Sequence, residues 1–106
     1  MVEDCDPTYG KVDDLLELLT RSKSLHILLI LDRKDGPMRF TDIKKQVDSS
    51  STTVSRRLKE LEIHDLVVVT SNEKKSSSKS YTLSKDAKTL GPIMQSLFDW
   101  VASREG

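Results

Sequence analysis

Apolar side chains recur at helical spacing in several parts of the chain, with polar side chains between them. The first stretch predicts a helix over about residues 10–21, behind a loose tail at 1–9. The second predicts a helix over 25–33 whose apolar residues cover nearly its whole circumference, which marks the central buried element. Ser24 and Thr41 are natural N-caps for the second helix and for a short third helix, because their hydroxyls accept free backbone N–H groups.

A fourth helix is predicted over about residues 51–64, immediately after consecutive serines that can cap it. Val54, Leu58 and Leu61 share one face of this helix at the i, i+4, i+7 spacing. The third and fourth helices are separated by a short break, which is the arrangement of a helix-turn-helix unit. A final helix is predicted over about 85–104, where apolar residues again recur at intervals of three and four.

The period of the pattern changes after Asp65. Residues 66–70 are rich in β-branched side chains and predict a strand, residues 71–80 are polar, and residues 81–83 predict a second strand. Residues 38–40 are long enough only for a small edge strand. A helix-turn-helix followed by a β-hairpin is a winged helix. We therefore predict one winged helix-turn-helix domain over residues 1–106, mainly α with a small β-hairpin wing.

The outer face of the fourth helix is the strongest candidate for function. Opposite its apolar face lie Thr52, Arg56 and Lys59, and no carboxylate precedes Glu60. The positive end of a helix and short hydroxyls suit phosphates, while an arginine can reach a base edge in the major groove. The alternative for Arg56 is a phosphate contact or an ordinary solvated surface position, and Arg57 projects nearer the core boundary, where a structural or phosphate role is expected. The candidate DNA-binding residues, including those of the wing, are Arg39, Ser51, Thr52, Thr53, Ser55, Arg56, Arg57, Lys59, Lys74, Lys75 and Lys79.

Charge is unevenly distributed along a chain of 106 residues that has no net charge. Residues 1–20 hold one basic and six acidic side chains, whereas residues 21–83 hold thirteen basic and eight acidic ones. A basic middle part can present one positive face to double-stranded DNA, although an acidic protein partner would fit it as well.

Both terminal helices have apolar faces that a small winged-helix core would not fully cover. Their union across a two-fold axis would bury both faces and predicts a homodimer that reads an inverted-repeat operator. A monomer with the last helix packed on the first is the alternative. The predicted interface residues are Leu15, Leu16, Leu19, Leu90, Ile93, Met94, Leu97, Phe98, Trp100 and Val101.

Several short motifs follow one another along the chain: Arg39 to Ile43, Arg57 to Glu62, Leu66-Val67, Tyr81 to Ser84, and Leu90 with Pro92 and Trp100. Taken in this order, they resemble the signatures of the HxlR-type winged-helix regulators, which are more distantly related to MarR-type regulators. The resemblance implies a homodimeric prokaryotic transcriptional regulator. Asp65, Ser49 and a wing without prolines depart from the family pattern.

Cys5 stands where many members of this family carry a cysteine, which makes it a possible redox-sensing residue. Asp4 and Asp6 beside it should raise the pKa of the thiol, which favours a thiol that does not sense. A single cysteine and the absence of a visible secretory signal or membrane span predict a cytoplasmic protein without membrane contact.

No catalytic arrangement is visible, so we expect neither an enzyme nor a cofactor. His26 and His64 are far apart in sequence and have no nearby histidine or cysteine, so no metal site is expected. The alternative function is a winged-helix protein-interaction module without DNA binding, because a fold does not fix a function. Ile63, on the outer side of the fourth helix, favours this alternative, whereas Arg56 and Lys59 favour DNA.

Overall fold

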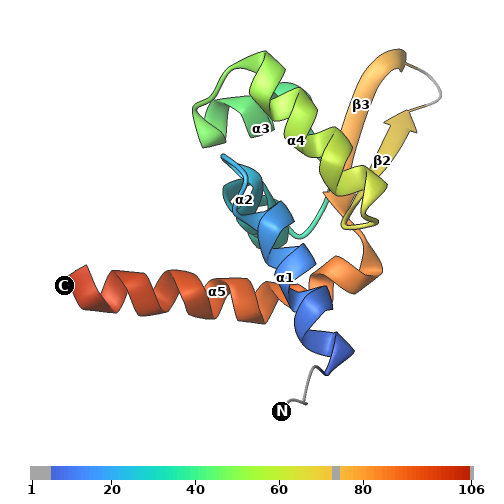
Figure 1. Cartoon of the computed structure of the whole chain (residues 1–106). Coiled ribbons are helices and arrows are strands. Elements are labelled where there is room, and N and C mark those ends of the chain that lie inside the picture. Colours follow the sequence, from blue (N-terminus) through green and yellow to red (C-terminus); the bar gives the residue numbers. More distant parts are fainter. Residues whose placement is uncertain (1–5, 73–74, 106) are drawn as a thin grey trace.

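Five helices and a three-stranded antiparallel sheet make up the protein in a computed structural model that describes residues 6–72 and 75–105 (Figure 1). Helices α3 and α4 pack on α2, the β-hairpin lies beside α4, and α5 extends away from the body. The elements are α1 Pro7–Leu19, α2 Ser24–Lys34, β1 Met38–Arg39, α3 Phe40–Val47, α4 Ser51–Ile63, β2 Val67–Asn72, β3 Lys75–Leu83 and α5 Lys85–Glu105.

The beginnings of the first two helices differ from the prediction. Helix α1 starts at Pro7 rather than near residue 10, because Asp6 caps it by accepting a hydrogen bond from the Thr8 N–H at 2.9 Å. The prediction that Ser24 caps α2 is wrong. Lys23 precedes that helix in the left-handed region at φ 71°, and Ser24 is a buried helical residue.

Helix α2 is the centre of the core, as its apolar circumference predicted. Ile27 and Leu28 are fully buried, and α2 packs against α1, α3, α4, α5 and the sheet. Helices α3 and α4 contribute one apolar face each, so the helix-turn-helix is fixed to α2 by burial of non-polar surface. The core side chains of α3 and α4 are Ile43, Val47, Val54, Leu58 and Leu61.

The caps of the helix-turn-helix are partly those predicted. Ser50 caps α4, and its Oγ accepts a hydrogen bond from the Thr53 N–H at 3.2 Å. Arg39, not Thr41, is the N-cap of α3, so α3 begins two residues earlier than a threonine cap requires. Asp48 closes α3 in the left-handed region at φ 51°, and Asp65 takes the same region at φ 61° after α4. A short polar side chain tolerates this backbone conformation better than most.

The wing is a β-hairpin whose strands are longer than the sequence pattern suggested. Strand β3 is central, with β1 on one side and β2 on the other, and all pairs are antiparallel. The hairpin continues through the polar region, where Ser71 pairs with Lys79, before the register shifts between Ser71 and Asn72. Backbone hydrogen bonds do not depend on apolar side chains, so the pattern under-predicted these strands. The predicted fold class, a winged helix-turn-helix, is confirmed.

Helix α5 begins at a serine cap and leaves the body after three turns. The Ser84 Oγ accepts a hydrogen bond from the Ala87 N–H at 3.1 Å. Met94 is the last fully buried side chain, and every residue from 96 to 105 is exposed. Where α5 crosses α2, Gly91 is in close contact with Asp32, and a Cβ at Gly91 would overlap the Asp32 carboxylate. The far half of α5 consequently projects from the domain (Figure 1).

Candidate DNA-binding surface

Helix α4 has three different sides, and its outer side carries most of the predicted DNA-binding residues. One side is buried in the core, as described above. The outer side is exposed and holds two basic groups among hydroxyl side chains. Its residues are Ser51, Thr52, Ser55, Arg56 and Lys59. Thr53 is half-buried, and its side-chain oxygen accepts a hydrogen bond from the Ser50 hydroxyl at 3.1 Å, so it belongs to the cap of the helix.

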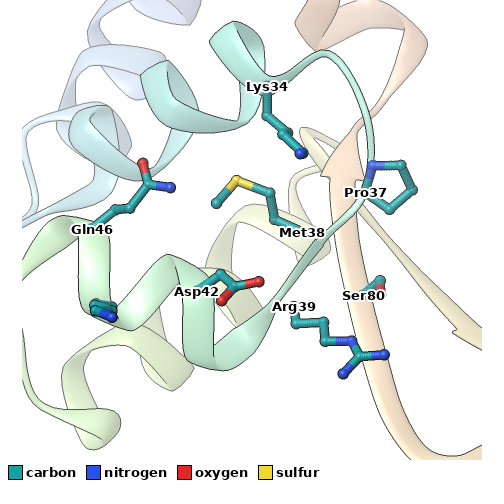
Figure 2. A pocket seen from close by; sticks show the side chains of 8 residues that line it. Lys34, Pro37, Met38, Arg39, Asp42, Gln46 and Ser80 are labelled. Carbon is teal, nitrogen blue, oxygen red and sulfur yellow. The ribbon is translucent and has the colours of Figure 1, made fainter.

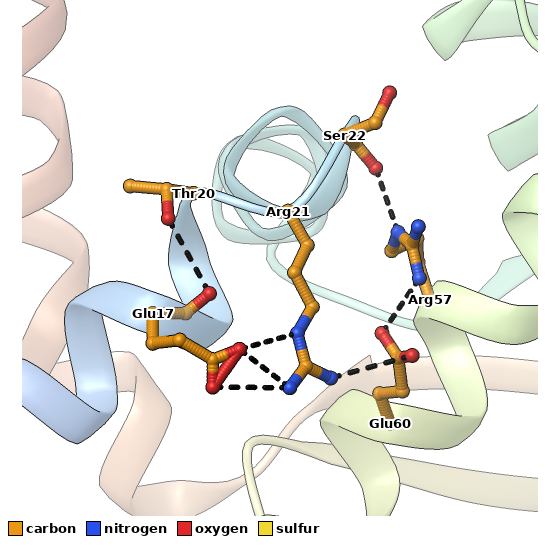
Figure 3. A network of polar contacts seen from close by, with 6 residues as sticks. All are labelled: Glu17, Thr20, Arg21, Ser22, Arg57 and Glu60. Atoms are coloured by element: carbon orange, nitrogen blue, oxygen red, sulfur yellow. Dashed lines mark hydrogen bonds and ion pairs between the residues drawn. The ribbon is translucent and has the colours of Figure 1, made fainter.

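The third side of α4 is half-buried and carries Arg57 and Glu60, which join a network of charges (Figure 3). Arg57 donates from Nε to the Ser22 carbonyl at 3.0 Å and from Nη1 to Glu60 Oε1 at 2.9 Å. Arg57 therefore faces the turn between α1 and α2 instead of the outer side that carries Arg56. These contacts agree with the structural role expected for Arg57 near the core boundary, and its assignment as a DNA contact stays a prediction.

Arg21 completes the network from the end of α1. It donates to the Glu17 carboxylate through Nε at 2.9 Å and Nη2 at 2.6 Å, and its Nη1 lies 3.3 Å from Glu60 Oε2. Partial burial raises the pKa of Glu60, but hydrogen bonds from Arg57 and Arg21 outweigh it, so the net shift is downward. The hydrogen bond to Glu17, and then that to Glu60, raises the pKa of Arg21.

Arg39 lies at the edge of the sheet, in a shallow pocket between α2, α3 and β3 (Figure 2). It pairs with Ser80 on β3, and its side chain is exposed. The pocket has a volume of about 340 Å³, and Asp42 shares it with Arg39 and two lysines. Its lining residues are Lys34, Pro37, Met38, Arg39, Asp42, Lys45, Gln46 and Ser80.

The predicted wing and redox residues are only partly within the described chain. Lys79 is exposed on β3, and Lys75 is the first residue of that strand. Lys74 and Cys5 lie outside the described residues, so their predicted roles remain predictions.

The predicted dimer residues divide into exposed and buried sets. Leu19 and Met94 are buried inside the protomer, so they are core residues here. Leu15 and Leu90 are half-buried against the core. The exposed set consists of five residues of α5 and one residue of α1. It comprises Leu16, Ile93, Leu97, Phe98, Trp100 and Val101.

Two features of the exposed apolar surface on α5 affect its chemistry. Ile93, Leu97 and Trp100, together with Ser96, line a shallow and almost wholly apolar groove of about 500 Å³. The Arg33 guanidinium lies 4.6 Å from the centre of the Phe98 ring, and that of Arg104 lies at the same distance from the Trp100 ring. In these cation–π contacts a charged side chain covers one face of each ring, and that side chain can move away from the ring.

The sequence reasoning missed the network centred on Glu60. Glu17 and Arg21 are four residues apart and Arg57 and Glu60 three apart, so each half was visible as a helical ion pair. The contact between the halves, which are separated by more than thirty residues, depends on the packing of α4 beside the end of α1.

In the part of the chain that the structure describes, no helix is long and apolar enough to span a membrane.

Comparison with known proteins identifies the family. The model of the HxlR-like helix-turn-helix family matches residues 21–105, most of the chain. The chain belongs to this family. An HTH-type transcriptional regulator of Halalkalibacterium halodurans is 33% identical over 75 residues, which are 70% of this chain and 66% of that relative. The protein is thus a winged-helix transcriptional regulator, as the resemblance implied, and the family consists of regulators rather than enzymes.

Two solved structures illustrate the shared fold. The reduced form of the transcriptional regulator YodB from B. subtilis has a TM-score of 0.75 and 26% identity, over 92% of this chain and 91% of that one. MepR from S. aureus, in complex with DNA, has a TM-score of 0.67 and 24% identity, over 93% of this chain and 82% of that one. The winged-helix arrangement therefore extends to proteins that differ from this chain at most positions.

Proposed function

We propose that this HxlR-like regulator binds specific double-stranded DNA sequences as a homodimer, with α4 in the major groove. The observation that carries the proposal is the outer side of α4, where Thr52, Arg56 and Lys59 are exposed to solvent. Arg56 is assigned to a base edge, because an arginine can donate two hydrogen bonds to a guanine. The hydroxyls of Ser51 and Thr52, at the positive end of the helix, are assigned to phosphates.

The wing is assigned to the flanking phosphate backbone. Lys79 is exposed on β3, Lys75 is the first residue of that strand, and Lys74 is included as a prediction from the sequence. Arg39 is exposed at the sheet edge and is assigned to a phosphate as well. Contacts of this kind orient a protein on the duplex without selecting a sequence.

The proteins with the same fold support DNA as the partner. The solved structure of MepR contains DNA, and the relative from H. halodurans and YodB are described as transcriptional regulators. We extend DNA binding to this chain because the side of α4 that the core leaves free is basic and hydroxyl-rich. The cytoplasm, where prokaryotic DNA is located, is the proposed place of action.

The homodimer is supported by the apolar surface of α5. Ile93 and Trp100 are about 60% exposed, and contact of such large apolar side chains with water is unfavourable. A second copy of the chain related by a two-fold axis would cover this surface with an identical one. The two copies of α4 would then enter successive major grooves, roughly 34–36 Å apart. The predicted operator is therefore an inverted repeat.

Selection from a random duplex library tests this function directly. We expect enrichment of an inverted repeat whose half-sites are about one helical turn apart. Enrichment of a single unrepeated site would contradict the dimer but not DNA binding. If no sequence is enriched, the proposed DNA binding is wrong.

A winged-helix protein-interaction module is the second candidate, and one observation favours it. Ile63 is 68% exposed at the end of α4, on the same side as Arg56. An apolar side chain there suits a protein surface better than a phosphate backbone. Because Ile63 lies two helical turns beyond Arg56 and no other apolar side chain of α4 is exposed with it, DNA remains the preferred partner.

A further inference from the structure

Glu60 is the centre of the charge network that joins α4 to the end of α1 (Figure 3). Its two carboxylate oxygens face different arginines, since Oε1 accepts from Arg57 Nη1 at 2.9 Å and Oε2 lies 3.3 Å from Arg21 Nη1. The side chains of Arg57 and Glu60 are only 15% and 24% exposed. This carboxylate therefore holds two guanidinium groups that water reaches only in part.

Each of the two arginines also donates to a second partner, which lies on α1 or in the turn after it. Arg21 holds the Glu17 carboxylate on α1 with its Nε and Nη2, while Arg57 Nε donates to the Ser22 carbonyl in the turn before α2. An unbroken series of charged contacts thus runs from α1, through the turn, to the third side of α4.

We propose that Glu60 is a positioning residue that fixes the orientation of α4 relative to α1, and thereby the separation of the two recognition helices in the dimer. This inference rests on the proposed function, in which two copies of α4 read DNA in a homodimer, and on the prediction from the sequence that both terminal helices contribute to the dimer interface. Val54, Leu58 and Leu61 attract α4 to the core, but burial of non-polar surface has no direction and permits the helix to roll. Charge-assisted hydrogen bonds are directional and restrict that motion.

The arrangement also explains why α4 carries adjacent arginines with different roles. Arg56 is exposed on the outer side and has its donors available for DNA, whereas Arg57 uses Nε and Nη1 inside the protein. Removing the charge of Glu60 would leave two partly buried cations without their shared partner, which is more disruptive than removing an exposed charge. The effect should appear where α4 must match DNA, that is, in specific binding.

The test compares Glu60→Gln with Glu62→Gln in the full chain. Both variants remove one negative charge from α4, but Glu62 is exposed and makes no contact in the network. Affinities are measured for the selected inverted repeat, for versions with one or two base pairs inserted or removed between half-sites, and for random duplex. For Glu60→Gln we expect affinity for the best spacing to fall roughly tenfold, with random duplex matching the Glu62→Gln control.

The dependence on spacing separates positioning from a loss of stability. In Glu60→Gln the preference among spacings should flatten, while the sedimentation mass and the thermal unfolding midpoint show a folded dimer. Glu60→Asp, which keeps the charge, should recover part of the preference. If Glu60→Gln and Glu62→Gln alter all duplexes alike, or keep the same spacing preference, the positioning role is wrong.

A measurement without DNA keeps the two proposals distinguishable. In a ¹H–¹⁵N spectrum the Arg57 Nε–H, which donates to the Ser22 carbonyl, should give a resolved signal in the wild type. That signal should shift or broaden in Glu60→Gln and stay unchanged in Glu62→Gln. If the wild type selects no DNA while the signal behaves in this way, the proposed function is wrong but Glu60 still positions α4 against α1. An unchanged signal in Glu60→Gln would show that Glu60 is not a positioning residue.

Discussion

At the scale of single residues, Arg56 is the sharpest test of how α4 reads DNA. Arg56→Ala should weaken specific duplex binding by about 1–3 kcal/mol and relax the preference at one position per half-site, because a two-hydrogen-bond contact to a base is lost. Binding titrations on all four bases at each position measure both effects.

The matched control for this residue is Arg56→Lys, which keeps the charge but cannot form the planar fork. If Arg56 contacts a base, Arg56→Lys should lose base selectivity too. If Arg56 contacts a phosphate, Arg56→Lys should bind DNA almost as the wild type does. Unchanged affinity and base preference in the alanine variant would show that the wrong face of α4 has been assigned.

Glu60 also gives the protein a dependence on pH. Its pKa in the folded chain lies below the ordinary value of 4.5, since hydrogen bonds from Arg57 and Arg21 outweigh its partial burial. A carboxylate with a lowered pKa stabilises the fold above its unfolded-state pKa, and that stabilisation is lost as the pH falls through the lower folded-state value.

The pH prediction is a difference between two proteins. Denaturant unfolding of wild type and Glu60→Gln should give free energies of unfolding that differ most near neutral pH and converge as the pH falls below 4.5. A gap that is constant or grows in acid would contradict the lowered pKa.

At the scale of elements, the wing is expected to contribute salt-dependent and sequence-independent affinity. Replacing Lys74, Lys75 and Lys79 with Gln should weaken binding to all duplexes alike. Each lost phosphate contact should flatten the plot of log K against log salt by roughly one unit.

The control for the wing changes the same amount of charge elsewhere. Lys11, Lys85 and Lys88 are exposed on α1 and α5, which carry none of the assigned DNA contacts, and their replacement with Gln should leave the salt slope near that of wild type. Equal slopes for the wing variant and the wild type would show that the wing does not contact DNA.

The comparison of sequence with structure is also clearest at this scale. The apolar face of α4 was predictable because Val54, Leu58 and Leu61 have an unambiguous helical spacing. The caps at Ser24 and Thr41 were not, because Lys23 and Arg39 precede these helices without a side-chain cap hydrogen bond, so backbone geometry alone decides where each helix begins.

Long-range polar contacts show a further limit of sequence reasoning. The pairs Glu17–Arg21 and Arg57–Glu60 are local and could be read from their spacing. The link from Arg21 to Glu60 exists only after the apolar face of α4 has packed beside the end of α1. The same holds for the division of the predicted interface, in which Met94 belongs to the core and Leu97 to the surface.

At the scale of the whole molecule, the exposed side of α5 predicts the assembly. Leu97→Glu places a charge in the apolar groove beside Ile93 and Trp100, and burying it against a second copy would be costly. Sedimentation equilibrium at micromolar protein should give about twice the 12.0 kDa chain mass for the wild type and the chain mass for the variant. Tight binding to the inverted repeat should be lost with the dimer.

Ser103→Glu is the control for this prediction, because it adds the same charge to the same helix outside the groove, at an exposed position. It should remain dimeric. A wild-type mass near 12.0 kDa would rule out the proposed assembly.

The projecting end of α5 links helix formation to protein concentration. Residues 96–105 are all exposed, so no core of their own protomer lies beneath them. A helical segment this short is marginal in water, and in a separated monomer it should fray into coil. Far-ultraviolet circular dichroism should therefore show helicity per residue that falls on dilution in the wild type and is already low in Leu97→Glu. Each encounter of two chains must then re-form these turns, and that ordering cost keeps the subunits exchangeable.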